Sequence, residues 1–547
     1  MKKILYVMAA GAMLLTTSCQ SYLDEVQPTG STLSLEQLKH GAEVSEDRAG
    51  AGLPGMYALL NEYNTVYGMQ GDFGYPSFIC RLEHAGDNVV STTHGYNWFN
   101  RELRLTSFQS KTSTTPGWAW IAFYRDIKLA NDVVAPLKGT QDPVNQKILG
   151  QALAQRAFCY LHLAQLFQKT YKGNEDAPCV PIVTEETKAA DAANNPRASV
   201  RDVYKLILDD LNKAIEYLNG FQPEQKNAIS EATAYGLRAR AHMLMHEFTK
   251  AAEDAQKAIE VSGATPYSIE DCSIPNFDDV QTSKNALWGI IITKEDRVTK
   301  SGIANWTSMF TSLCFGNGGY TTLVGTYKMI NSRLFDLIPD TDVRKGWWAY
   351  EEFKYKDNKG VEKTGYTSPI MKKAYPNEYQ WVATKHTLPL TVLKFAPTDK
   401  DLAKEENSVD FMLMRVEEMY YIMAEAKAMA GDLAGGKQVL ENFVKTYRDP
   451  GFTSKAADAK ALQDEIYLQK RVEFFGEGIS WFDMIRMGKG IDRVDVAGKN
   501  TGGYPPLTRF NVPAGDPIFV LQIPESEEQA NKAIVNNPLA TEPKDMI

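Results

Sequence analysis

The segment with the densest charge is Lys470–Gly478, which is followed directly by Trp481–Arg486. Its carboxylates Glu473, Glu477 and Asp483 could do acid/base work on a glycosidic bond if two of them stood about 5–9 Å apart. Arginines alternate with these carboxylates, however, and would hold them ionised, whereas a general acid needs a raised pKa. Charges in such a packed, aromatic segment are more often paired and structural. We therefore expect no catalytic residue here and predict that the segment orients the last helices.

Two further groups contain residue types that bind metal ions. His242 and His246 stand four residues apart on a predicted helix, so both could face one ion, but no third ligand accompanies them. Asp340 and Asp342 could offer oxygens to calcium, but no EF-hand loop surrounds them and turn chemistry explains them better. Packing and turn formation are the preferred interpretations. No cofactor and no metal site are expected, with a structural calcium ion left as an alternative that no motif supports.

The cysteines do not indicate a site either. Apart from Cys19 they are widely spaced and include no CxxC pair, at Cys80, Cys159, Cys179, Cys272 and Cys314. An odd number at such spacing argues against a disulfide framework and against zinc. We expect buried free thiols.

The elements that must position these residues are mostly helices. Apolar side chains recur at three- and four-residue spacing, the pattern of amphipathic helices, in 151–168, 203–218, 232–260, 410–447 and 462–487. Two of these stretches also carry the small residues of a helix-turn-helix repeat. In the second, Gly431 is placed to end one helix and Asp432 to start the next. Both stretches look like tetratricopeptide units, although ordinary helical hairpins are the alternative.

The remaining territory, at about 62–118 and 264–407, is rich in glycine, proline, asparagine and aromatic residues. Leu287–Ile292 in this territory suits a buried strand. Long irregular connections are usually functional or disordered, and the aromatic content argues against disorder. The predicted fold class is mainly α: a tetratricopeptide-like helical repeat scaffold at about 120–262 and 408–490, with a loop-rich, ligand-facing half that contains short strands.

The first residues have the features of a targeting segment. Two lysines precede a short apolar stretch at Ile4–Leu15, and small residues then lead to Cys19. This pattern is typical of a secretory signal rather than a membrane span, and the residues before Cys19 resemble a bacterial lipobox. We expect residues 1–18 to be a lipoprotein signal peptide, Cys19 to carry the lipid anchor, and residues 19–547 to form a single body.

The overall charge excludes some partners. The net charge is −9, and no local basic patch stands out, so general binding to nucleic acid is not expected. Beyond the N-terminus, no run approaches the roughly 20 apolar residues that would span a bilayer.

Several motifs, taken in order, resemble those of the SusD/RagB family of outer-membrane nutrient-binding lipoproteins, a starch-utilisation-system-like family. They are Tyr22–Asp24 after Cys19, Trp120–Asn131, Gln155–Tyr160, Pro178–Val183, Met414–Ala426, Lys470–Arg486, Leu521–Pro524 and Asn536–Pro538. Met414–Ala426 looks like the family's RxAExxLxxAEA signature, and Lys470–Arg486 is the most specific match. The resemblance covers nearly the whole mature chain.

This resemblance implies a surface-exposed lipoprotein of a Bacteroidetes-like outer membrane that binds glycans and is not an enzyme. Such a protein would capture oligosaccharide or polysaccharide and deliver it, as a lid, to a SusC-like TonB-dependent transporter. Capture of peptides, as in RagB-like members, is the alternative within the same architecture. A surface glycoside hydrolase and a repeat scaffold that binds only protein are further rivals.

The resemblance also implies where ligand would bind, because relatives bind glycans through aromatic residues of the two loop-rich regions. Stacking platforms suit the apolar faces of sugar rings. The predicted platforms are Trp98, Trp306 and Tyr320, with Tyr96 in the same aromatic cluster as Trp98. The predicted polar partners are Asp72, Arg81 and Asp87. Core packing is the alternative for each aromatic residue.

Overall fold

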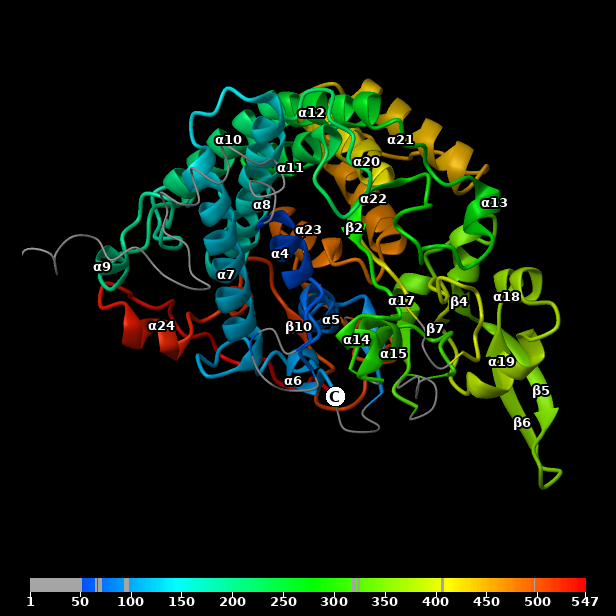
Figure 1. Cartoon of the computed structure of the whole chain (residues 1–547). Helices are drawn as coiled ribbons and strands as arrows, with labels where there is room; N and C mark the ends of the chain where they lie inside the picture. Colours follow the sequence, from blue (N-terminus) through cyan, green and yellow to red (C-terminus); the bar gives the residue numbers. More distant parts are fainter. Residues whose placement is uncertain are drawn as a thin grey trace, which may run out of the picture.

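The computed structural model describes residues 52–63, 66, 71–92, 98–302, 304–316, 321, 325–404, 408–495 and 497–547. Helices form one side of the molecule, and short strands with long connections form the other (Figure 1). The predicted fold class is confirmed: the chain is mainly α and its helical scaffold is tetratricopeptide-like. No helix of the described residues has both the length and the apolar character needed to cross a membrane.

All but one of the long helices follow the predicted apolar stripes, and the exception, Thr114–Leu137, lies outside them. The long helices are α7 (Thr114–Leu137), α8 (Pro143–Phe167), α10 (Val200–Tyr217), α11 (Glu231–Leu244), α12 (Phe248–Ser262), α20 (Val416–Met429), α21 (Leu433–Tyr447), α22 (Ala459–Glu473) and α23 (Ile479–Arg486). Each of α7, α8, α10, α11 and α12 packs against the next in this order, and α12 then packs against α20. Segments far apart in the sequence thus form one continuous helical layer.

Side-chain caps set where several of these helices begin. The Ser230 hydroxyl accepts a hydrogen bond from Thr233 N at 3.1 Å at the start of α11. Between α20 and α21, Gly431 has a φ of 101°, and the Asp432 carboxylate accepts from Gly435 N at 2.9 Å. Because glycine tolerates positive φ and a carboxylate satisfies a free N–H, these two residues end one helix and start the next as the sequence predicts.

The small residues of the repeats allow close helix approach. A Cβ atom added to Gly436 of α21 would lie 2.6 Å from the carbonyl oxygen of Ala424 in α20. A Cβ atom on Gly236 of α11 would lie 2.4 Å from the sulfur of Met414. The backbone contact leaves no room for a side chain at 436, whereas a side chain at 236 would require the flexible Met414 side chain to move.

The strands are short and antiparallel. One sheet has the order β1 (Val89–Ser91), β3 (Lys328–Ile330), β7 (Thr391–Val392), β4 (Trp348–Ala349), and the other pairs are β2 (Ala286–Ile290) with β8 (Phe411–Arg415), β5 (Glu351–Lys356) with β6 (Glu362–Thr367), and β9 (Ile491–Asp492) with β10 (Asn511–Val512). The buried strand β2 lies within the run that the sequence predicts as a strand. The β5–β6 hairpin projects from the body (Figure 1).

Short helices that the apolar pattern did not predict occur in the loop-rich half and in the connections outside it. They are α4 (Leu53–Leu59), α5 (Tyr75–Ala85), α6 (Asn100–Leu103), α9 (Ala189–Ala192), α13 (Ile269–Cys272), α14 (Arg297–Lys300), α15 (Trp306–Phe310), α17 (Ser332–Phe335), α18 (Pro369–Ala374), α19 (Tyr379–Lys385) and α24 (Glu525–Ala530), with 3₁₀ turns at Val343–Trp347 and Pro517–Phe519. Every residue of α5 is buried. Its polar residues Ser77, Arg81 and His84 recur on one face, but that face is enclosed as well as the apolar one.

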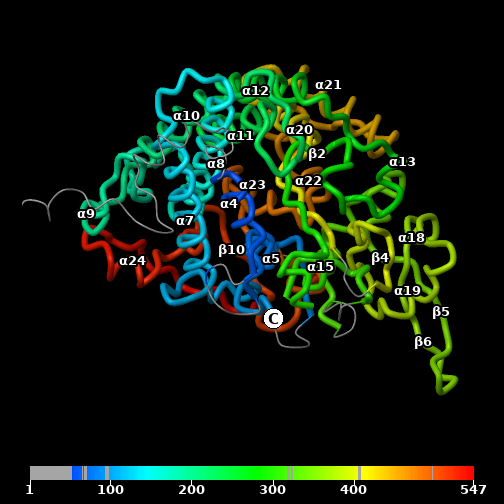
Figure 2. Tube along the Cα trace, in the orientation of Figure 1, coloured from blue at the N-terminus to red at the C-terminus, as the bar shows by residue number. Residues whose placement is uncertain are grey.

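The C-terminal segment returns to the first half of the chain. Figure 2 shows α24 beside α9, where Lys532 N donates to the Ala193 carbonyl oxygen at 3.0 Å. Nearby, the Arg197 guanidinium donates to the Val535 carbonyl oxygen at 3.0 Å. The C-terminal segment is therefore held against residues 193–197 by hydrogen bonds to backbone carbonyl oxygens.

Candidate functional site

The carboxylate Glu473 at the end of α22 is surrounded by arginines. Arg448 Nε donates to its Oε2 at 2.6 Å, Arg344 Nη1 donates to the same oxygen at 3.1 Å, and Arg415 Nη1 donates to Oε1 at 3.1 Å. Burial by itself would raise the pKa of Glu473, but the three guanidiniums outweigh it and hold that pKa well below its usual range. A carboxylate held ionised in this way cannot serve as a general acid.

The other two carboxylates of the motif are also paired with buried cations. Glu477 accepts from Arg415 Nε at 2.8 Å and also contacts the Lys394 ammonium group. Asp483 accepts from Arg486 at 2.8 Å and pairs with Lys470. Despite burial, those two cations lower the pKa of Asp483. The geometry of this motif therefore fits the predicted structural role.

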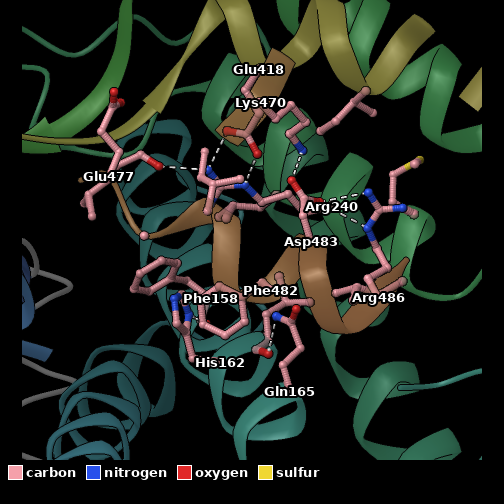
Figure 3. A pocket seen from close by; sticks show the side chains of 18 of the residues that line it. Phe158, His162, Gln165, Arg240, Glu418, Lys470, Glu477, Phe482, Asp483 and Arg486 are labelled. Carbon is pink, nitrogen blue, oxygen red and sulfur yellow. Dashed lines mark hydrogen bonds and ion pairs between the residues drawn. The ribbon is translucent and has the colours of Figure 1, made fainter. Parts of the chain in front are cut away.

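A cavity of about 80 Å³ lies behind this motif (Figure 3). Its walls come from α8, α11, α20, α22 and α23. Across it, Arg240 makes two hydrogen bonds of 2.7 and 2.6 Å to the Glu418 carboxylate. Burial lowers the pKa of His162 in its wall to about 3, so this imidazole is neutral. The space suits a few water molecules and is too small for a sugar chain.

Three of the predicted ligand residues, Asp72, Arg81 and Trp98, come together in the loop-rich half of the molecule. A Cβ atom added to Gly71 would lie 3.0 Å from the Trp98 ring and 3.2 Å from Arg81 Nη2. Arg81 donates to the Gly71 carbonyl oxygen at 2.8 Å and to Glu102 Oε1 at 3.1 Å. Asp72 accepts from the indole nitrogen of Trp118 at 2.8 Å. The distant residues 71–81 and 98–118 are thus joined by side-chain hydrogen bonds.

Exposure differs within this cluster. Asp72 is only 1% exposed and Arg81 only 6%, whereas Trp98 is half-buried. The two charged residues therefore brace the cluster from inside. Among the described residues of the cluster, Trp98 has the side chain with surface left for a ligand.

Asp87 lies at a different place. Its Oδ1 is 3.1 Å from the Arg471 guanidinium, and its Oδ2 accepts from Asp492 N at 3.2 Å. It is 5% exposed. These contacts tie the end of α5 to the C-terminal region, so the structure places Asp87 as an internal brace rather than at a surface open to ligand.

Trp306 requires a correction, because its ring belongs to the core. It is 2% exposed and stacks on Phe310 with ring centroids 4.5 Å apart. Phe411 meets its ring edge at a centroid distance of 4.9 Å. The preceding residue, Asn305, caps α15 by accepting from Ser308 N at 2.8 Å. The Trp306 ring therefore fills the core, and the Asn305 side chain caps a helix.

The remaining predicted positions lie outside the described residues; they are Tyr96, Tyr320 and Cys19, the predicted lipidation site. The cysteines at 80, 159, 179, 272 and 314 are buried free thiols. Within the ranges that the structure describes, no group of three or more His, Cys, Asp or Glu residues could hold a metal ion. His242 bonds Glu247 at 2.7 Å, and Asp342 pairs with Arg344.

Sequence reasoning missed one exposed aromatic residue. Trp381 of α19 is 40% exposed, and its ring centroid lies 4.6 Å from that of Phe315. The only sequence signal is local: an aromatic and amide run, Tyr379–Trp381, between turns. No apolar period marks so short a helix.

A larger open groove of about 920 Å³ lies beside α4. Half-buried rings of Tyr57, Tyr63 and Phe221 line it together with amide side chains such as Gln222 and Gln225. Tyr57 is fixed by donating to Gln151 Oε1 at 2.7 Å. Aromatic faces with amides are suited to small polar ligands, and the volume is in the range of such sites.

Comparison with known proteins adds to these observations. A family model described as "Starch-binding associating with outer membrane" matches residues 57–243, and the model of the SusD family matches residues 306–539. SusD-like protein P2 of Formosa agariphila is 24% identical, with 77% of this chain and 79% of that protein covered. A SusD-like protein of Bacteroides ovatus is 22% identical, with 67% and 64% covered.

Solved structures agree on the fold. A SusD-like carbohydrate binding protein from Bacteroides vulgatus superposes with a TM-score of 0.71 at 24% identity, covering 90% of this chain and 97% of the other. A laminarin binding SusD-like protein superposes with a TM-score of 0.57 at 16% identity, covering 90% and 98%. At such identities, the likeness to solved structures supports the fold alone. Because the two family models follow one another along most of the chain, the protein belongs to the SusD/RagB family.

Proposed function

We propose that this protein is a cell-surface glycan-binding lipoprotein that captures oligosaccharide and passes it on without breaking a bond. It delivers the ligand to a SusC-like TonB-dependent outer-membrane transporter, for which it acts as a lid. The observation that carries the proposal is the pair of family matches, one of them described as starch-binding and associating with the outer membrane. A neighbour described as laminarin binding is in line with it.

A non-enzymatic role is supported by the state of the carboxylates. The acids in the most specific motif, Glu473, Glu477 and Asp483, each contact at least one arginine or lysine. A retaining or inverting glycosidase needs one carboxyl group that keeps its proton and faces the substrate. All three are buried and paired with cations, and the pKa values of Glu473 and Asp483 are lowered, so binding is the favoured activity.

Trp98 is the best candidate for a ligand contact among the described residues that the sequence nominates. Its ring is half-buried, and Arg81 and Asp72 fix its surroundings through hydrogen bonds to Gly71, Glu102 and Trp118. A rigid aromatic ring loses little conformational entropy when it binds, which suits a stacking platform. Tyr96 and Tyr320 complete this proposed site, and Arg81 and Asp72 hold it in place.

The proposed partner and location follow from the family. Lipid on Cys19 would hold the protein at the outer membrane, and several acyl chains are needed for stable anchoring. The helical layer offers a broad surface for a transporter, as helical repeats commonly do.

The test measures the binding of the purified protein without its lipid anchor to a glycan panel that contains malto-oligosaccharides and laminari-oligosaccharides. Isothermal titration should detect saturable binding of at least one glycan, and prolonged incubation should release no new reducing ends. Binding to a peptide library with no glycan response would replace the glycan proposal with peptide capture. Turnover that depends on two carboxylates would replace it with a hydrolase. Co-purification of the native lipoprotein with a TonB-dependent transporter tests the partner.

A further inference from the structure

Trp381 differs from the other tryptophans of the chain in its exposure. It is 40% exposed, Trp98 is half-buried, and the other seven are buried: Trp118, Trp120, Trp288, Trp306, Trp347, Trp348 and Trp481. An indole left in water loses the favourable transfer of its apolar area. Its exposure therefore needs an explanation.

The exposed ring is held by a neighbour rather than standing free. Phe315 lies with its ring centroid 4.6 Å from that of Trp381, at an interplanar angle of 56°. Phe315 N donates to the Leu402 carbonyl oxygen at 3.0 Å, which fixes the backbone that carries this ring. Tilted aromatic pairs at this distance are mutually attractive. Phe315 therefore limits the directions in which the indole can turn.

The helix beneath the ring is also fixed. Val382 and Ala383 of α19 are buried against the β5–β6 hairpin. Tyr355 of β5 donates its hydroxyl to the Thr384 carbonyl oxygen at 3.3 Å. A Cβ atom on Gly365 of β6 would lie 1.9 Å from the Ala383 carbonyl oxygen, so strand and helix are in direct contact. The exposed indole thus sits on a rigid support.

Polar groups accompany the ring. The Lys385 ammonium nitrogen lies over the Trp381 ring, 5.9 Å from its centroid, and among the described residues it has no carboxylate within ion-pair distance. Gln380, the preceding residue of α19, is exposed. A sugar ring needs an aromatic face for its C–H groups and nearby donors or acceptors for its hydroxyls. Both are available here.

The size of this surface favours a sugar over a protein as the ligand. A stable protein interface buries about 800 Å² on each side around an apolar centre. Here the apolar surface is one indole and one half-buried phenyl ring, on a helix that also carries the charged Lys385 and the polar Gln380 and Thr384. Two rings are far less than such an apolar centre, and they match the size of a sugar ring better than that of a folded protein. Phe315 also belongs to the same segment as Tyr320, a position proposed for ligand contact.

We propose that Trp381, braced by Phe315 and bordered by Lys385, is a stacking platform for a pyranose ring of a bound oligosaccharide. The proposal rests on the proposed glycan-binding function and adds a contact on α19, at a residue of the second loop-rich region that the sequence did not single out. Lys385 would donate to a hydroxyl or carboxylate oxygen of the same sugar. No bond is made or broken in this step.

The test uses the exposure of Trp381 as its probe. Laminarihexaose, maltohexaose and an oligogalacturonate are titrated, and quenching of tryptophan fluorescence by acrylamide is followed. Trp381→Ala should weaken binding of the recognised sugar about fivefold to tenfold, and Trp381→Phe should retain most of the affinity. In the wild type, bound sugar should protect part of the fluorescence from acrylamide, and both variants should lose the share of that protection that Trp381 contributes.

Val361→Ala is the matched control, because Val361 is an exposed apolar residue of the β5–β6 hairpin. It should bind like the wild type, and thermal unfolding should be the same for all three variants. Wild-type binding with unchanged affinity in Trp381→Ala would overturn the platform and leave the proposed function standing. No binding of any glycan by the wild type would overturn both.

Discussion

Arg448 Nε donates to Glu473 Oε2 at 2.6 Å, and neither side chain is exposed to solvent. The two residues belong to different helical pairs, since Arg448 follows α21 and Glu473 ends α22. Arg448 also donates to the Tyr267 carbonyl oxygen at 2.7 Å, which links the loop-rich half to the helices. The best-matched family motif therefore joins the two halves of the molecule.

Glu473→Gln should destabilise the fold strongly. The amide cannot neutralise Arg448, Arg415 and Arg344, which would remain buried around it. Removing one partner of a buried ion pair costs about 3–5 kcal/mol. Urea unfolding followed by circular dichroism should show this loss.

Asp209→Asn is the control for that substitution. Lys205 and Asp209 form an exposed pair at 2.5 Å on α10. Exposed pairs contribute about 0.5 kcal/mol or less, so the control should unfold close to the wild type. Equal effects of the two substitutions would contradict the structural role of Glu473.

Trp306→Ala should lower stability rather than simply remove a ligand contact. The substitution leaves a cavity among Phe310, Phe395 and Phe411, whose rings contact the indole. Such a truncation in a core costs about 3–5 kcal/mol. Differential scanning calorimetry should show a lower Tm for this variant.

Trp98→Ala provides the contrast. Its ring is half-buried at the loop-rich end, so a smaller loss of stability is expected, together with glycan affinity about threefold to tenfold weaker. If Trp306→Ala kept the wild-type Tm and lost ligand, the core assignment of Trp306 would be wrong.

Gly436→Ala should separate α21 from α20. The added Cβ would lie 2.6 Å from the Ala424 carbonyl oxygen and 3.0 Å from the Ala428 Cβ. Forcing atoms into a packed helix contact costs about 1–3 kcal/mol. Chemical unfolding measures the change.

Gly55→Ala tests the same chemical change without the clash, because nothing lies within 4 Å of the added atom on α4. It should be neutral or stabilise by about 0.5–1 kcal/mol, since alanine favours a helix. A loss of stability in both variants would show that helix approach is not the reason for the glycine at 436.

The helical layer was predictable because its signals are local. The cap at Asp432 and the apolar stripes depend on residues within a few positions of each other. In the enclosed helix α5 the local pattern does not report burial, since its polar residues Ser77, Arg81 and His84 are as buried as its apolar ones. Its burial depends on segments far away in the sequence.

The binding residues were less predictable for the same reason. Asn97-Trp98 and Asn305-Trp306 have the same local composition, yet Trp98 keeps exposed surface and Trp306 does not. The difference comes from Phe395 and Phe411, which are about 90 to 105 positions away in the sequence and close over Trp306. Trp381 is the opposite case, an aromatic residue that the sequence did not single out and that is exposed. The β5–β6 hairpin covers its neighbours Val382 and Ala383 and leaves the indole uncovered.

Glu83 gives the protein a component of stability that depends on pH. Its carboxylate accepts from Gly478 N at 2.9 Å, inside the contact between α5 and the turn before α23. Burial raises its pKa from 4.5 to about 7, against the smaller lowering effect of that hydrogen bond. The folded state therefore keeps the proton to higher pH than the unfolded chain does. The stabilisation is complete below pH 4.5 and is lost as the pH rises through about 7.

Glu83→Gln removes this titration while keeping the acceptor oxygen for Gly478. Relative to the wild type, the free energy of unfolding of the variant should rise by about 3 kcal/mol between pH 4.5 and 8, the equivalent of the pKa difference. Asp126 and Asp410, whose pKa values burial also raises to about 7, titrate in both proteins and cancel in the comparison. Urea unfolding across this pH range measures the difference, with Glu253→Gln on the exposed face of α12 as control. A difference between Glu83→Gln and wild type that stays constant with pH would show that Glu83 is already ionised in the folded protein, because only a carboxyl group that keeps its proton on folding can produce this slope.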